Sequence, residues 1–470
     1  MGKKISENRD IAFLLPHNLD DWLPSNHPAR FLDAFVDGLD LDELGFMKHT
    51  GERGRSYYGT TLLLKVFLYA YFRTIKGHRA MELQCNENIA FLWLTGMNHP
   101  DHNTLWRFYD RNKKAIQNLF KQSVKLACEL ELVDVVLCAV DGTKIVADVS
   151  KKKTIHKKDL LYIKKNVDEI AKEKANNFES NDDQNDDTNS DIIIPRNLKD
   201  IDLSKENIKK MLDDLDLSET NHLNKTDQDA RLMKTNDGSI KMAYNGQATV
   251  DSKIGIIVGC DLTNKGSDNN YLNKMISTTL DNIGVVPNLT LADGGYCSGY
   301  ELYKADENDY NVLVNAPRKT KQKIKNLNWE YHISKFEYDS DSDTYTCPKG
   351  ELLEFVREIK KSEYSARKYR CRNYKSCKYV TECTKSKRGR TIEVNPYKSY
   401  IDKQLELLKN ENNKLLLNRR KTIVEPVFGY IKRILNFRRF TVRTIENVTT
   451  QWNLICTTIN LRKIYAYAFK

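Results

Sequence analysis

The chain has 470 residues, of which 40% are apolar and 24 are Tyr. This composition can bury a sizeable core and excludes global disorder, and at ~150 residues per domain the length predicts about three modules. Apolar runs such as 62–70 are far shorter than the ~20 residues of a membrane span, and the first residues lack a secretory signal. We therefore expect a soluble, cytoplasmic protein that has no membrane partner.

Charge is unevenly spread along the chain. Lys and Arg (75) exceed Asp and Glu (64) by 11, and residues 357–390 hold 13 basic residues against three acidic ones. The segment 177–191 has six acids and no base, which is typical of a disordered connector. The basic segment is either a solvated face or a surface for a polyanion such as nucleic acid.

The first 130 residues read as a helical domain. Apolar spacing predicts helices over 60–75 and 78–94, the second closed by Gly96. Asn103 or Thr104 can cap a further helix that continues to Val124. A helix–turn–helix with exposed Arg and Lys would bind DNA, whereas a helical bundle with a polar face fits the same pattern.

Residues 131–445 read as an α/β domain with two insertions. Strands are predicted over 132–140, 244–250, 254–262, 285–292 and 311–315, with a helix over 269–280. The first insertion, 151–237, reads as a helical hairpin with the acidic connector. The second, 317–395, is basic and rich in cysteine. Helical patterns follow over 405–417 and 423–435, and 446–470 forms a C-terminal helix.

Two aspartates stand where a predicted strand runs into a glycine-containing turn. Asp141 begins Asp-Gly-Thr-Lys, and Asp293 begins Asp-Gly-Gly-Tyr. Sites in α/β sheets gather at the carboxyl ends of strands. Asp-Gly is also a common turn dipeptide, and Asp251, Asp261 and Asp268 lie near strand ends too, so position alone does not select the pair.

A third acid, Glu425, lies in a basic helical segment. Pro426 follows it, so we place Glu425 at a helix start or kink. Three converging carboxylates would suit Mg²⁺ (or Mn²⁺) and phosphoryl transfer, although a capping glutamate is the simpler interpretation. The neighbouring cations could bind DNA phosphates: Arg419, Arg420, Lys421 and Lys432.

Together these motifs resemble those of bacterial insertion-sequence DDE transposases, in particular the IS-eleven-eighty-two family. The resemblance rests on Asp141-Gly-Thr-Lys, Leu291-Ala-Asp293-Gly-Gly-Tyr and Val424-Glu425-Pro-Val-Phe-Gly-Tyr-Ile-Lys432. Residues 87–96, 100–102, 229–234 and Tyr244-Asn-Gly-Gln247 are also similar. It implies an RNase H-like core with Asp141, Asp293 and Glu425 as the metal-binding catalytic triad. It further implies double-stranded DNA partners, both element ends and target, and a homodimer or higher oligomer at the bacterial nucleoid.

The sequence departs from the family pattern just before the glutamate. Related transposases often carry Tyr and Arg seven and four residues before it, where this chain has Asn418 and Lys421. Lys432 matches the family lysine seven residues after the glutamate. The basic character is kept, while the assignment of single phosphate-binding residues stays open.

Four cysteines cluster in the second insertion: Cys347, Cys371, Cys377 and Cys383. Four thiols in a reduced, basic segment could form a structural Zn²⁺ site. Because the spacing lacks a Cys-x-x-Cys pair, four unligated thiols are the alternative.

The main hypothesis is therefore a transposase that cuts element ends and transfers the strands. The alternative from another class is a catalytically inactive, transposase-derived DNA-binding repressor. A third possibility, a metal-dependent nuclease or phosphatase, would not need the amino-terminal helices.

Overall fold

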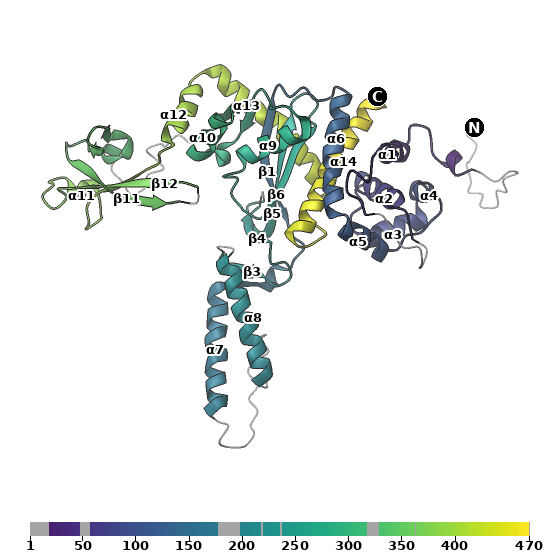
Figure 1. Cartoon of the computed structure of the whole chain (residues 1–470), viewed down its shortest axis with the longest axis horizontal. Coiled ribbons are helices and arrows are strands. Elements are labelled where there is room, and N and C mark those ends of the chain that lie inside the picture. Colours follow the sequence, from purple (N-terminus) through teal and green to yellow (C-terminus); the bar gives the residue numbers. More distant parts are fainter. Residues whose placement is uncertain are drawn as a thin grey trace, which may run out of the picture.

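The computed structural model describes residues 18–47, 57–176, 198–217, 220–235, 237–316, 329–361 and 363–469. The fold is mixed α/β, as predicted. A central sheet lies between the amino-terminal helices and a small sheet lobe, and a long helical hairpin projects from the body (Figure 1). The acidic segment 177–191 lies outside the described residues.

The amino-terminal helices pack around α2, which is buried on most of its surface. Their bounds are α1 Pro28–Asp37, α2 Thr60–Phe72, α3 His78–Glu87, α4 Ile89–Thr95, α5 His102–Arg111 and α6 Lys113–Glu129. Gly96 ends α4 in the left-handed conformation, as expected for a C-terminal glycine.

Two helices predicted as continuous are each broken by an asparagine. The Asn88 side chain accepts the Ala90 N–H at 3.0 Å and so starts α4 afresh after α3. The buried Asn112 amide accepts the Met47 N–H at 2.9 Å and donates to the Phe108 carbonyl at 2.9 Å, between α5 and α6. The cap of α5 is Asp101, and the prediction of Asn103 or Thr104 was wrong.

The central sheet has six strands in the order β4-β5-β1-β7-β8, with β6 also paired to β5. Their bounds are β1 Cys138–Val146, β4 Arg231–Lys234, β5 Ile240–Asp251, β6 Ile257–Thr263, β7 Thr290–Ala292 and β8 Val312–Val314. β5 runs antiparallel to β1, β4 and β6, while β1, β7 and β8 are parallel. Parallel strands bring their carboxyl ends to one edge.

Helices cover both faces of this sheet. One face packs against α9 Leu272–Ile283 and α10 Gly299–Glu307, which α12 Lys398–Leu407 covers in turn. The other face packs against α13 Glu411–Gly429 and α14 Ile445–Ala468. α14 also lies along α6, and the buried Tyr109 hydroxyl donates to the Asn447 carbonyl at 2.6 Å, so one core joins the helices to the sheet.

Three predicted boundaries were wrong near the candidate acids. The first strand was expected over 132–140, but β1 begins at Cys138 and passes straight through Asp141 to Val146. The strand before Asp293 spans three residues instead of 285–292. Glu425 lies inside α13, because burial of Val424 and Val427 on both sides of Pro426 continues the helix. A π-helical turn, Tyr430–Ile434, follows.

The projecting hairpin consists of α7 Lys157–Asn176 and α8 Leu198–Leu217 (Figure 1). Strands β2 Thr154–His156 and β3 His222–Asn224 pair at its base. A small apolar cluster that includes Leu160, Ile208 and Leu212 holds the two helices together.

The small lobe is a five-stranded antiparallel sheet in the order β13-β12-β11-β10-β9. Its bounds are β9 Glu337–Asp339, β10 Thr344–Thr346, β11 Leu352–Lys360, β12 Ser365–Cys371, α11 Val380–Cys383 and β13 Thr391–Val394. Among the described residues of the lobe, the apolar cluster has five buried members: Phe336, Leu353, Tyr369, Cys371 and Ile392.

Candidate active site

Asp141 lies in the middle of β1, opposite Ala248 of β5. Side chains alternate along a strand, and Ala139 and Ile145, which share the parity of Asp141, join the core formed with α13 and α14. Asp141 therefore belongs to the face that α13 covers. Its side chain is 18% exposed.

The strand register brings Asp293 to Asp141. Cys138 pairs with Thr290 and Ala139 with Leu291 in the parallel β1–β7 ladder. Carried two residues further, this register places Asp141 opposite Asp293. Asp293 directly follows β7, as predicted, and its carboxylate accepts the Gly295 N–H at 2.7 Å.

Arg420 connects Asp141 to Glu425. The guanidinium donates to Asp141 Oδ2 at 2.7 Å, and its second terminal nitrogen lies 4.0 Å from Glu425 Oε1. Both Arg420 and Glu425 lie on α13, which packs across β1 and β7. Arg420 thus approaches two of the three acids that the sequence singled out, and the strand register places the third, Asp293, opposite Asp141.

The electrostatics of Asp141 are those of a crowded carboxylate. Burial raises the pKa of Asp141, and the nearby charge of Asp293 raises it further. Arg420 and the Gly142 N–H oppose the rise without cancelling it. Asp141 is therefore costly to ionise where it is buried, and a cation beside it would offset that cost.

The predicted phosphate-binding residues differ in position. Arg419 and Lys421 are exposed on α13, while Arg420 is 13% exposed and pairs with Asp141. Lys432 lies in the π-helical turn, half-buried, and burial together with neighbouring Lys144 lowers its pKa. Arg419 and Lys421 are therefore open to solvent on the helix that carries Glu425, and Lys432 lies near enough to Asp141 to interact with its charge.

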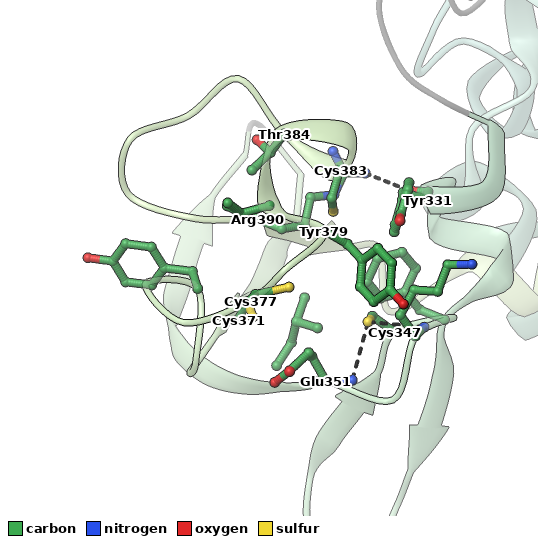
Figure 2. A pocket seen from close by; sticks show the side chains of 14 residues that line it. Tyr331, Cys347, Glu351, Cys371, Cys377, Tyr379, Cys383, Thr384 and Arg390 are labelled. Carbon is green, nitrogen blue, oxygen red and sulfur yellow. Dashed lines mark hydrogen bonds between the residues drawn. The ribbon is translucent and has the colours of Figure 1, made fainter.

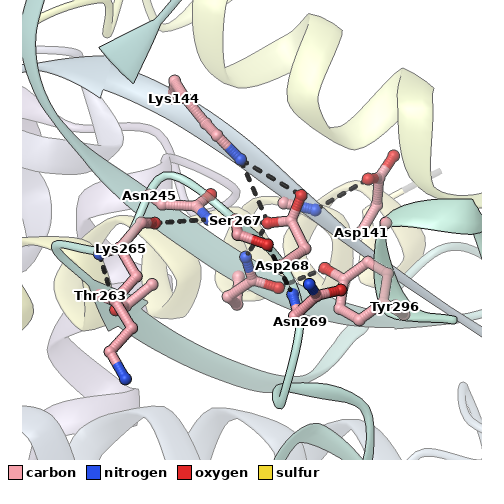
Figure 3. A network of polar contacts seen from close by, with 12 residues as sticks. Asp141, Lys144, Asn245, Thr263, Lys265, Ser267, Asp268, Asn269 and Tyr296 are labelled. Atoms are coloured by element: carbon pink, nitrogen blue, oxygen red, sulfur yellow. Dashed lines mark hydrogen bonds and ion pairs between the residues drawn. The ribbon is translucent and has the colours of Figure 1, made fainter. Parts of the chain in front are cut away.

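A fourth acid adjoins the site and was not selected from the sequence. Asp268, in the loop between β6 and α9, accepts hydrogen bonds from Lys144, Asn245 and Gln247 (Figure 3). The signal for it was the Asp-Gly-Thr-Lys motif, whose glycine makes room for its carboxylate. The remaining strand-end acids serve elsewhere: Asp251 binds turn amides, and Asp261 pairs with Lys274 at 2.5 Å.

The four clustered cysteines line one cavity of ≈ 20 Å³ in the small lobe (Figure 2). Cys347 Sγ accepts N–H groups from Lys349 at 3.4 Å and Glu351 at 3.3 Å. Burial raises the pKa of Cys383 to about 11, and all four thiols are free. Within the part of the chain that the structure describes, no three Cys, His, Asp or Glu side chains are already arranged to hold a metal ion.

Comparison with known protein families adds two matches. Residues 17–111 match the family described as Transposase domain (DUF772), and residues 346–465 match the one described as Transposase DDE domain. The chain carries transposase domains. The second match contains Glu425 and the four cysteines, while Asp141 and Asp293 precede it.

No curated protein and no solved structure matches this transposase chain. Among the described residues, no helix is long and apolar enough to cross a membrane.

Proposed function

We propose that this transposase binds the ends of a mobile DNA element and catalyses metal-dependent cleavage and strand transfer with Asp141, Asp293 and Glu425. The observation that carries the proposal is that Arg420 bonds Asp141 and approaches Glu425, while the strand register places Asp293 opposite Asp141. We assign the RNase H-like core to the six-stranded sheet with its covering helices. Membership of the IS-eleven-eighty-two family is part of the proposal.

The donor set suits Mg²⁺, with Mn²⁺ as a substitute. Both ions prefer carboxylate oxygens and keep waters for a phosphate substrate. When bound, the ion would stabilise charge on the attacking and leaving oxygens of an in-line displacement. Burial, and to a smaller extent the charge of Asp293, raises the pKa of Asp141. This supports the proposal, because a bound cation would stabilise the ionised carboxylate.

The reaction has two phosphoryl transfers. In cleavage, a water oxygen bonds to phosphorus and the bond from phosphorus to the 3′-oxygen breaks. The proton lost by the water goes to the departing 3′-oxygen, so the products are a 3′-hydroxyl and a 5′-phosphate. In strand transfer, that hydroxyl bonds to a target phosphorus while a target 3′-oxygen leaves with a proton. Arg419, Lys421 and Lys432 would bind the flanking phosphates and hold the DNA in line.

DNA binding is assigned to the helical domain 1–130 and to the basic lobe. Arg107 and Arg111 are exposed on α5, whereas α6 packs along α14. We expect a homodimer or higher oligomer on DNA, since two element ends must be processed together, with the protein at the nucleoid. Binding should weaken as salt concentration rises, because phosphate contacts release counterions.

The cysteines of the small lobe would hold structural zinc. They line one cavity, and two backbone N–H groups are directed at Cys347 Sγ. A cavity of ≈ 20 Å³ has room for a water or a single ion. The sulfurs would have to approach one another further to reach Zn–S distances of ~2.3 Å.

The test is element-end cleavage and binding by Asp293→Asn, which keeps the shape of the side chain and removes its charge. Loss of several kcal/mol of transition-state stabilisation predicts cleavage reduced about a thousandfold or more in Mg²⁺, with end binding retained. Asp306→Asn is the control, because Asp306 is an exposed residue of α10 that pairs with Lys403.

Two outcomes would count against the proposal. Wild-type cleavage by Asp293→Asn would remove this residue from the mechanism. An unmutated protein that binds the ends without ever cutting them would favour the repressor alternative.

A further inference from the structure

We propose that Asp268 is a positioning residue for this reaction, whose carboxylate holds together the segments that carry Asp141 and Asp293. The inference rests on the proposed function, since it assumes that those two acids act together. The inference goes beyond the proposed function, because it gives a role to Asp268, which lies outside the triad, and to the motif residues that contact Asp268.

The Asp268 carboxylate is almost fully used by neighbouring donors (Figure 3). Its Oδ1 accepts from Asn245 Nδ2 at 2.7 Å and from Gln247 Nε2 at 2.8 Å, both buried on β5. Lys144 of β1 donates to Oδ1 at 3.1 Å and to Oδ2 at 3.2 Å. One carboxylate thus ties β1 to β5 beside Asp141.

One glycine makes room for this carboxylate and a second lies within contact distance of it. A Cβ on Gly142 would lie 2.6 Å from Asp268 Oδ1 and 2.4 Å from Gln247 Nε2. A Cβ on Gly295 would lie 3.4 Å from Asp268 Oδ2. These glycines follow Asp141 by one residue and Asp293 by two, so the Asp268 carboxylate lies between the two backbone segments that present the catalytic acids.

A buried tyrosine extends the network to the segment after Asp293. The Tyr296 hydroxyl donates to Gln247 Oε1, while the Nε2 of the same amide donates to Asp268. Burial, followed by the charge of Asp268, raises the pKa of Tyr296, which keeps the hydroxyl protonated as a donor. Asp268 therefore fixes the orientation of the Gln247 amide, and that amide holds Tyr296.

Asp268 acts through these neighbours and is not a fourth metal-binding acid. Gly142 and Lys144 alternate with Asp141 along β1, so the network lies on the opposite face of the strand from Asp141. Lys144 also neutralises the Asp268 charge. One set of contacts thereby accounts for residues of Asp141-Gly-Thr-Lys, of Tyr244-Asn-Gly-Gln247 on β5 and of Asp293-Gly-Gly-Tyr. These residues are Gly142, Lys144, Asn245, Gln247, Gly295 and Tyr296.

The experiment compares the Mg²⁺ dependence of element-end cleavage in wild type and Asp268→Asn. The amide oxygen can still accept from Asn245 and Gln247. The amide nitrogen replaces Oδ2, so the contact of Oδ2 with Lys144 and the charge that pairs with Lys144 are both lost at nearly constant volume. Loss of a residue hydrogen-bonded directly to a metal ligand typically costs ~10–100-fold in metal affinity or activity. Asp268 reaches Asp141 and Asp293 only through their neighbours, so we expect the half-saturating Mg²⁺ concentration to rise by ~10-fold at most, with end binding unchanged.

Asp281→Asn is the matched control, because Asp281 is an exposed aspartate on α9. A merely structural role would lower the melting temperature and the active fraction without moving the Mg²⁺ dependence. Lys144→Met tests the same unit, and the double variant should be no worse than the more impaired single variant if the two residues act together.

Three results would overturn the inference. The first is an Asp268→Asn enzyme with wild-type Mg²⁺ dependence. If Asp293→Asn is inactive in the same assay, this result leaves the proposed function intact. Another is loss of cleavage at every Mg²⁺ concentration, as expected of a direct ligand. The third is wild-type cleavage by Asp293→Asn, which would fail the proposed function as well.

Discussion

Two arginine–aspartate pairs in this transposase have opposite electrostatics. In the central sheet, Arg420 donates to Asp141 at 2.7 Å; in the small lobe, Arg367 donates to Asp343 at 2.6 Å and 3.0 Å. The pKa of Asp343 is lowered, first by the Tyr369 hydroxyl, whereas burial raises the pKa of Asp141 despite its arginine. Both partners of the lobe pair are more than a third exposed, while Asp141 is 18% exposed.

The difference separates a carboxylate that stabilises the fold from one that costs stability. A folded-state pKa below the ordinary 3.8 means that Asp343 adds stability above that pH and loses it as pH falls. A raised pKa means that ionised Asp141 destabilises the fold as pH rises through 3.8. A buried charge that opposes folding is typical of a functional site.

The largest effect is expected for Asp141→Asn. Cleavage should fall about a thousandfold or more, because a charge needed by the metal is removed. The melting temperature should stay the same or rise, because the ionised carboxylate is unfavourable in the folded state. Cleavage rates and thermal unfolding of the purified variant check both. A strongly destabilised variant that still cuts would contradict the comparison.

Gly142→Ala should impair folding and activity together. The new Cβ would lie 2.4 Å from Gln247 Nε2 and 2.6 Å from Asp268 Oδ1, and such overpacking typically costs ~1–3 kcal/mol. Thermal unfolding measures the loss. Gly429→Ala is the control, since no atom lies within 4 Å of its added Cβ and alanine favours the helix. Equal melting temperatures for the two variants would show that β1 tolerates the side chain.

Removal of zinc from the four clustered cysteines should destabilise the small lobe and leave the site of Asp141, Asp293 and Glu425 unchanged. We expect one zinc per chain in protein purified without chelator, and loss of that zinc in Cys377→Ser. Elemental analysis measures it, with Cys128→Ser on α6 as the control. Limited proteolysis should then cut the lobe faster, because its core is small. Zinc that is absent from wild type, or unchanged in Cys377→Ser, would favour unligated thiols.

The smallest effect is expected for Asp343→Asn. The lobe loses its charged partner for Arg367, so hydrogen exchange of β11 and β12 should quicken slightly at neutral pH. The wild-type lobe should lose protection below pH 3.8, and the variant should lack that pH dependence. Asp341→Asn, at an exposed residue nearby, serves as the control. An identical acid response in both variants would remove Asp343 from the comparison.

Local patterns predicted the elements better than the contacts between them. Gly96 as a helix end and the end of a strand just before Asp293 follow from neighbouring residues, and both were confirmed. The start of that strand and the helix breaks at Asn88 and Asn112 were not predicted. The Asp141-Gly142 dipeptide reads as a turn, yet it is strand, because its glycine serves the approach of Asp268 from 126 residues away. No local pattern encodes that approach.

The site around Glu425 shows the same limit. Proline disfavours helical geometry at the residue before it, here Glu425. Burial of the apolar neighbours on both sides of Pro426 overrides this preference, and the helix continues. The pairing of Arg420 with Asp141 joins residues 279 positions apart, so the sequence predicted a basic residue there and not its partner. The local sequence therefore predicts which types of side chain the site contains, whereas packing between distant segments decides which of these side chains contact one another.

The most direct test of the central claim is to locate a bound ion. Crystals grown with Mn²⁺ should give an anomalous peak within ~2.2 Å of carboxylate oxygens from Asp141, Asp293 and Glu425, with Arg420 moved off Asp141 Oδ2. The same peak should be absent from Glu425→Gln crystals. A protein that cuts element ends in that Mn²⁺ buffer and yet shows no peak between these three residues would contradict the account.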